Sequence, residues 1–136
     1  MKRIKSAQRP PELEAPILRG ILDACGVLGI VAVRSNAGGG WRPGRGGKPQ
    51  LVKGMPQGWP DITGWIPGDG RFLGVEAKAP GKEPTREQVF TMRTMNNTGA
   101  VAFWSDDIEI ATRTLIHLKK GARIVMHENG EWGIRL

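Results

Sequence analysis

The chain has 136 residues, of which 39% are hydrophobic, and this combination is typical of one soluble domain that buries a core of its own. Its net charge of +7 and its pI of about 10.2 indicate an acidic partner, most commonly nucleic acid, although solubility alone also explains a positive charge. The charge is unevenly spread, because no acidic residue lies between Asp23 and Asp61.

The apolar segments and the single cysteine argue against a membrane-spanning protein and against a protein stabilised by intrachain disulfides. Residues 17–33 form the most apolar stretch, but Arg19, Asp23 and several glycines interrupt it, so we expect no membrane span and no membrane partner. Cys25 is the only cysteine, so an intrachain disulfide is impossible and a reducing compartment fits. The basic N-terminus continues into prolines and glutamates instead of an apolar segment, so we expect a cytoplasmic protein without a secretory signal.

The N-terminal part is expected to hold an arm, a helix and a strand. Residues 1–11 are predicted to be a flexible basic arm, and residues 12–136 a single domain. Apolar residues at helical spacing predict a helix at 14–26, with Pro16 in its first turn, where proline is tolerated. The β-branched run at 29–35 predicts a buried strand.

The next segment, residues 36–54, is rich in glycine and arginine and has few apolar side chains to bury. A loop of this length in a compact domain is usually either functional or disordered. Its positive charge suits a path along a phosphate backbone. We expect it to contact DNA through Asn36, Arg42, Arg45, Lys48 and Lys53. Trp41 in this loop and Trp59 just after it are expected either to stack on DNA bases or to pack against the protein.

The second half of the chain predicts alternating strands and helices around clear turn sequences. Pro67-Gly68-Asp69-Gly70 joins strands at 61–66 and 71–79 into an antiparallel hairpin. The later elements are a helix at 86–97 capped by Thr85, a strand at 100–104, a helix from the cap at 105–107 to Leu118, and a hairpin of 122–127 and 132–136 around Asn129-Gly130. We therefore expect an α/β fold with a mixed β-sheet flanked by helices.

Two acidic motifs lie on the first predicted hairpin. Asp61 follows Gly58-Trp59-Pro60, and Glu76-Ala77-Lys78 begins fifteen residues after Asp61. Residues two apart in a strand face the same side, so Glu76 and Lys78 point together, and the hairpin brings Asp61 beside Glu76. A charge in an apolar strand is costly unless it is paired or binds a metal. Either motif alone is more often a turn or a solvated strand, but the combination on adjacent strands favours a site.

The expected site has the donors that a hard divalent cation prefers. The carboxylates of Asp61 and Glu76, with the Ala77 carbonyl, offer oxygen ligands for Mg²⁺. Such a cation makes water easier to deprotonate and neutralises charge on a phosphate. Lys78 is expected to orient the attacking water or to stabilise the developing charge. The residues therefore predict a metal-dependent nuclease, with a non-catalytic DNA-binding module as the alternative.

These motifs, with Gln88 in the following helix, resemble the PD-(D/E)xK nuclease superfamily, and within it the VRR-NUC domain family. The family pattern is an opening helix with a glutamate, an asparagine after the first strand, a basic glycine-rich loop, a G-x-PD turn, an E-x-K strand and a downstream glutamine. The chain matches this order over about residues 12–105, with Glu14 or Glu12, Asn36, the loop at 42–53, Gly58 to Asp61, Glu76 to Lys78, and Gln88.

The resemblance implies a restriction-endonuclease-like core and Mg²⁺- or Mn²⁺-dependent hydrolysis of DNA phosphodiester bonds. It implies catalytic roles for Asp61, Glu76, Lys78, Gln88 and Glu14, and metal contacts for Asp61, Glu76, Ala77 and Glu14. Stand-alone, virus-type members are homodimers that act on branched DNA such as four-way (Holliday) junctions, and a phage protein of this kind would work in the cytoplasm of a bacterial host. Nicked, flapped or linear DNA is the alternative substrate.

A homodimer would supply the two active sites that opposed cuts in a junction need. The C-terminal segment offers apolar residues for its interface, namely Ile108, Leu115, Leu118, Ile124, Val125, Trp132 and Ile134. Packing of these residues inside one copy is the alternative.

Overall fold

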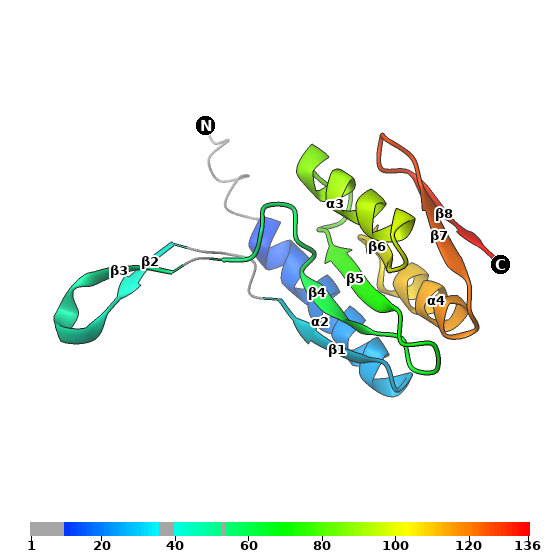
Figure 1. Ribbon diagram of the computed structural model, residues 1–136, viewed down its shortest axis with the longest axis horizontal. Helices are drawn as coiled ribbons and strands as arrows, with labels where there is room; N and C mark the ends of the chain where they lie inside the picture. Colours follow the sequence, from blue (N-terminus) through cyan, green and yellow to red (C-terminus); the bar gives the residue numbers. More distant parts are fainter. Residues whose placement is uncertain (1–9, 36–39, 53) are drawn as a thin grey trace.

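The computed structural model describes residues 10–35, 40–52 and 54–136 (Figure 1). Most of the predicted arm at 1–11 lies outside the described residues, as do Asn36 and Lys53. The backbone of Trp41 and Arg42 is described, but their side chains are not.

The described residues form three α-helices, one 3-10 turn and eight strands. In chain order these are α2 (Pro10–Val27), β1 (Val31–Arg34), β2 (Gly40–Pro43), η1 (Arg45–Gly47), β3 (Pro49–Val52), β4 (Ile62–Trp65), β5 (Phe72–Ala77), α3 (Arg86–Asn97), β6 (Val101–Ser105), α4 (Ile108–Lys119), β7 (Arg123–Met126) and β8 (Trp132–Arg135). Within the described ranges, no helix combines the length and the apolar character that crossing a membrane requires.

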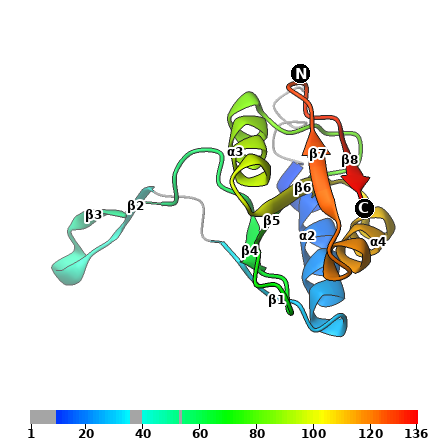
Figure 2. The same ribbon diagram turned by 45° about the vertical axis from the view of Figure 1, so that its right-hand side comes forward.

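Four strands form one mixed sheet in the order β1-β4-β5-β6. Strand β4 pairs antiparallel with β1 and β5, whereas β5 and β6 are parallel and are joined through α3. Helices α2 and α4 cover one face of this sheet and α3 lies on the other (Figures 1 and 2). The expected mixed sheet flanked by helices is therefore confirmed, and the restriction-endonuclease-like core stays a prediction.

Strand β5 separates two apolar layers. Leu73 and Val75 point to one face and join the core that α2 and α4 cover. Gly74 points to the other face, where an added Cβ would lie 2.7 Å from Met95 Cε and 2.8 Å from Pro60 Cγ. Glycine at this position therefore lets α3 approach the sheet closely. Glu76 lies two residues after Gly74 on β5 and therefore faces the same side, so its side chain lies on the α3 side of the sheet.

The described part of the glycine- and arginine-rich segment contains a β-hairpin, so the prediction of a loop without strands is wrong. Strands β2 and β3 pair antiparallel and η1 connects them. The hairpin projects to one side of the sheet and helices (Figures 1 and 2). Sequence reasoning missed it because glycine and proline, which have low strand propensity, occupy several of its positions.

Two further expectations about the N-terminal elements are wrong. Helix α2 begins at Pro10, because proline suits the first positions of a helix, so Pro16 lies inside the helix and not in its first turn. Strand β1 is an edge strand whose Val31 and Val33 are 45% and 63% exposed, so it is not a buried strand. The reason is that α3 packs on β5 and β6 and leaves the outer face of β1 open.

The apolar C-terminal residues are divided between core and surface. Three are buried, namely Leu115, Leu118 and Ile124, and Trp132 packs against Phe103 with ring centroids 5.2 Å apart. Three others stay partly exposed, namely Ile108, Val125 and Ile134. Internal packing thus explains part of this segment, and its role in a homodimer stays a prediction.

Candidate active site

The strand ends that carry the two acidic motifs lie side by side. Asp61 comes immediately before β4, and Glu76 and Ala77 are the last residues of β5. Because Ile62 is paired with Val75, the antiparallel register continues to Asp61 opposite Glu76. The hairpin therefore brings together the carboxylates that the sequence predicted to meet.

Backbone hydrogen bonds tie each of these carboxylates to the strand that bears the other. The Asp61 N–H donates to Glu76 Oε1 at 3.3 Å, and the Ala77 N–H donates to Asp61 Oδ2 at 3.0 Å. The two bonds fix the position of both side chains relative to the sheet. Such preorganisation on rigid elements is what a binding or catalytic site requires.

Gln88 holds the second oxygen of Glu76. Its Nε2 donates to Glu76 Oε2 at 2.7 Å, while its Oε1 accepts the Thr85 N–H at 2.8 Å. Thr85 Oγ1 in turn accepts the Gln88 N–H at 3.2 Å, which completes a capping box at the start of α3. The capping box turns the oxygen of the Gln88 amide toward Thr85 and its nitrogen toward Glu76. Sequence reasoning found Thr85 as a cap but missed this second effect, although the Thr-x-x-Gln spacing indicates it.

For the metal-dependent nuclease that the sequence predicts, Gln88→Ala is expected to lower cleavage about 10- to 100-fold, because outer partners that orient a ligand carboxylate usually contribute this much. The loss should appear in kcat and not in the KM for DNA, since Gln88 donates to Glu76 and would act through that carboxylate. Glu87→Ala, on the same helical turn but with an exposed side chain, is the matched control and should cleave within about twofold of the wild type. Equal rates for both variants would contradict an orienting role for Gln88.

Lys78 supplies the positive charge at this site. Its Nζ lies 3.7 Å from Glu76 Oε2, and the two side chains are 12% and 3% exposed. Its backbone N–H donates to the Ser105 carbonyl at 3.0 Å, which anchors the end of β5 to β6. The ammonium group is therefore held beside the carboxylates and largely out of solvent.

Glu14 adds a third acidic group from α2. Burial raises its pKa first, and the charge of Asp61 raises it further, while Lys78 and Arg34 lower it. These mutual effects show that Glu14 shares the electrostatic environment of the Asp61–Glu76 pair. The side chain of Glu12 lies outside the described residues, so the choice between the two glutamates rests on this observation.

The electrostatics of the pair fit a divalent cation. Burial, together with the charge and hydrogen bond of Asp61, raises the pKa of Glu76 to about 9, although Lys78 acts in the opposite direction. A cation would favour the ionised form, and the carboxylate oxygens with the Ala77 carbonyl are hard donors that suit Mg²⁺ or Mn²⁺. Among the described residues, no three His, Cys, Asp or Glu side chains are gathered closely enough to hold one ion. A direct metal contact by Glu14 therefore stays a prediction.

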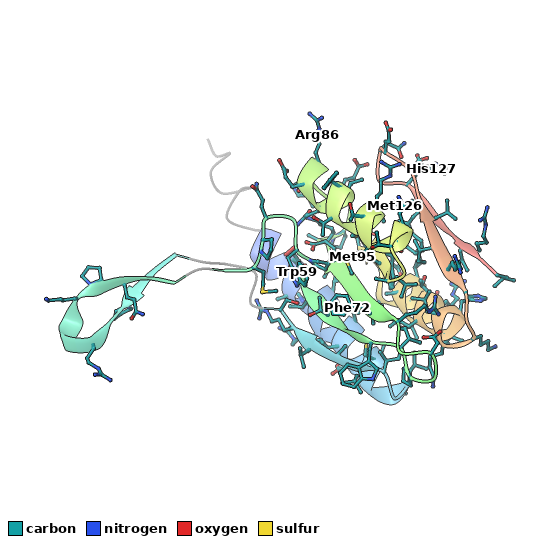
Figure 3. The ribbon with its side chains drawn as sticks, viewed as in Figure 1. Trp59, Phe72, Arg86, Met95, Met126 and His127 are labelled. Carbon is teal, nitrogen blue, oxygen red and sulfur yellow. The ribbon has the colours of Figure 1, made fainter. Side chains whose placement is uncertain are left out.

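Three of the residues predicted to contact DNA have described side chains, namely Arg45, Lys48 and Trp59. Arg45 and Lys48 are exposed on the projecting β2–β3 hairpin (Figure 1). Trp59 is partly buried and packs against Phe72, with ring centroids 6.1 Å apart (Figure 3). This contact favours packing for Trp59, and its stacking on DNA stays a prediction.

Comparisons with models of known families, with curated proteins and with solved structures found no match.

Proposed function

We propose that this protein is a divalent-metal-dependent endonuclease that hydrolyses DNA phosphodiester bonds. The observation that carries the proposal is the Asp61–Glu76 pair, in which Glu76 is buried and Lys78 and Gln88 both contact that glutamate. A structural role alone does not explain why three polar side chains converge on a carboxylate that is only 3% exposed. Functional sites are where such costly arrangements are found.

Each residue has a role that follows from its position. Asp61, Glu76 and the Ala77 carbonyl would hold Mg²⁺ or Mn²⁺, which neutralises negative charge on the phosphate and activates water when bound. Gln88 keeps the Glu76 carboxylate in place through the capping box. Lys78 orients the attacking water or stabilises the charge that develops on the phosphate oxygens. Glu14 assists from α2 by adding negative charge that strengthens cation binding.

The proposed class is the PD-(D/E)xK superfamily, with the VRR-NUC family as its branch. The order of the motifs supports this, since the aspartate precedes β4, the Glu-x-Lys motif ends β5 and the glutamine opens α3. We further propose a homodimer that acts on branched DNA. Support for a DNA substrate comes from the net charge of +7 and from the basic, exposed β2–β3 hairpin, which offers phosphate contacts beyond the carboxylates.

Cleavage is expected with Mg²⁺ or Mn²⁺ and is expected to stop in excess chelator. The purified protein would be incubated with matched four-way junction, flap, nicked and linear duplex DNA, and the products separated on a denaturing gel. The junction should be cut fastest. Full cleavage in chelator would contradict the metal site, whereas preference for nicked, flapped or linear DNA would correct the substrate alone. Tight DNA binding with no cleavage in any metal would identify a binding module instead of an enzyme.

A further inference from the structure

A groove between α3 and the β7–β8 hairpin is lined by three arginines and no acidic residue. It encloses about 250 Å³, and its polar lining includes Arg93 and Asn97 from α3, Arg123 from β7 and Arg135 from β8. The volume equals that of about eight water molecules, at about 30 Å³ each, so the groove has room for more than one phosphate group. The groove was not predictable from the sequence, because α3, which bears Arg93, is distant along the chain from the hairpin that bears Arg123 and Arg135.

The charges of these arginines are not balanced by the protein around them. Arg123 and Arg135 are direct cross-strand partners, and like charges in that position destabilise a hairpin. Among the described residues, no carboxylate lies within 4.0 Å of the guanidinium groups of Arg93, Arg123 or Arg135. An anion in the groove would remove this repulsion.

Arg93 is already oriented toward the groove. Its Nε donates to the Met126 carbonyl at 3.3 Å, which holds the guanidinium at the edge of β7. Arginine binds phosphate through paired N–H groups, so the remaining donors of Arg93 suit a phosphate oxygen. Asn96 is a wall of the groove and not a donor to it, because its amide is bonded to both backbone groups of Ala102.

Helix α3 connects the groove to the candidate active site. Gln88 lies in its first turn and Asn97 at its end, about 13 Å apart at 1.5 Å per residue. Arg86, Phe90 and Arg93 follow one face of the helix, with Phe90 72% exposed and Arg86 at the outer end of α3 (Figure 3). Since one DNA strand advances about 3.4 Å per nucleotide, the groove lies about four nucleotides from a bond cut beside Gln88.

We propose that this arginine groove binds backbone phosphates of DNA about four nucleotides from the bond that is cut. The distance from the cut rests on the proposed nuclease function, whereas phosphate binding in the groove does not. Arginines at a phosphate act without reading bases, so the groove contributes affinity and position, but no sequence preference.

The salt dependence of DNA binding tests the proposal. Binding of a labelled duplex would be measured in chelator, where no cleavage occurs. The variant Arg93→Gln/Arg123→Gln/Arg135→Gln should reduce the slope of log K against log salt concentration by about 2 to 3, at about 0.9 per phosphate contact. The matched control Arg19→Gln/Arg113→Gln/Lys119→Gln removes equal charge from α2 and α4, which cover the other face of the sheet, and should change the slope by less than about 1. Equal slopes for the two variants would overturn the proposal.

Two further measurements distinguish a charge contact with DNA from a structural role of the arginines and from a site for a small anion. The Arg93→Lys/Arg123→Lys/Arg135→Lys variant keeps the charge, so it should keep both the slope and the melting temperature, and a loss of slope at an unchanged melting temperature would contradict a charge contact. Backbone amide shifts of Asn97 and Val125 should move when duplex DNA is added. Movement with inorganic phosphate but not with duplex would assign the groove to a small anion and overturn the proposal. Cleavage is scored separately, so failure of the nuclease proposal remains distinguishable from failure of this one.

Discussion

Glu76→Ala is expected to abolish cleavage while leaving the protein as stable as before, or more stable. The rate should fall by about a thousandfold or more, a loss typical for a group that stabilises the charge of a transition state. Stability should not fall in parallel, because the carboxylate is buried beside Asp61, and burial together with that neighbouring charge raises its pKa to about 9. Removing this carboxyl group relieves its repulsion with Asp61 and Glu14, which offsets the hydrogen bonds and packing that are lost.

Leu73→Ala is the matched control for this prediction. Leu73 lies on the same strand, is fully buried, and points to the opposite, apolar face. Its truncation should cost about 2–5 kcal/mol of unfolding free energy and leave the activity per folded molecule near that of the wild type. Thermal melting in chelator and cleavage with Mg²⁺ would be measured for both variants. A large loss of stability in Glu76→Ala would show that Glu76 is chiefly a structural residue.

The pH dependence of stability gives the same residue a second test. The pKa of Glu76 is raised on folding from 4.5 to about 9, so its protonated form is favoured in the folded state. The stability that protonated Glu76 provides is fully present below the pKa of the unfolded state. It is lost as the pH rises through the pKa of the folded state. In chelator, the melting temperature of Glu76→Ala relative to the wild type should therefore increase between about pH 5 and pH 9. A difference that does not vary with pH would contradict a buried, neutral Glu76.

The β4–β5 hairpin and its carboxylates were predictable because the forces that form them are local. Pro67 and Gly70 define the turn, and alternation along β5 decides which side chains face α3. The Thr85 cap is equally local, since it depends on residues within one turn of the helix. Turns, strand alternation and helix caps of this kind can therefore be predicted from residues that are neighbours along the chain.

Features that depend on contacts between distant elements were not predictable in the same way. The exposure of β1 follows from the placement of α3 over β5 and β6. The residues of β1 themselves do not indicate where α3 packs. The contact between Gln88 and Glu76 needs a helix to be docked on a sheet, and the arginine groove needs α3 and the β7–β8 hairpin to be adjacent. The β2–β3 hairpin is a different case, because its backbone pairing overrides the poor strand propensity of its residues.

Lys78→Ala is expected to lower kcat by about 10²- to 10³-fold and to leave DNA binding nearly unchanged. The ammonium lies 3.7 Å from Glu76 and is mostly buried, so in the proposed nuclease we expect it to act beside the carboxylates and not as a surface contact to DNA. A group that acts mainly in the transition state affects turnover more than affinity. Lys78→Met keeps the packing of the aliphatic stem and removes only the charge, so it should be as inactive as Lys78→Ala.

Lys82→Ala is the control, because Lys82 is an exposed lysine only four residues from Lys78. The Lys82→Ala variant should cleave DNA at the wild-type rate. Single-turnover rates and equilibrium binding would be measured for all three variants. Near-normal cleavage by Lys78→Met would mean that the ammonium serves only to balance the charge of Glu76. Loss of binding together with cleavage would mean that it contacts the DNA backbone directly. Loss of turnover alone, in both variants, is the result that a role in the chemical step requires.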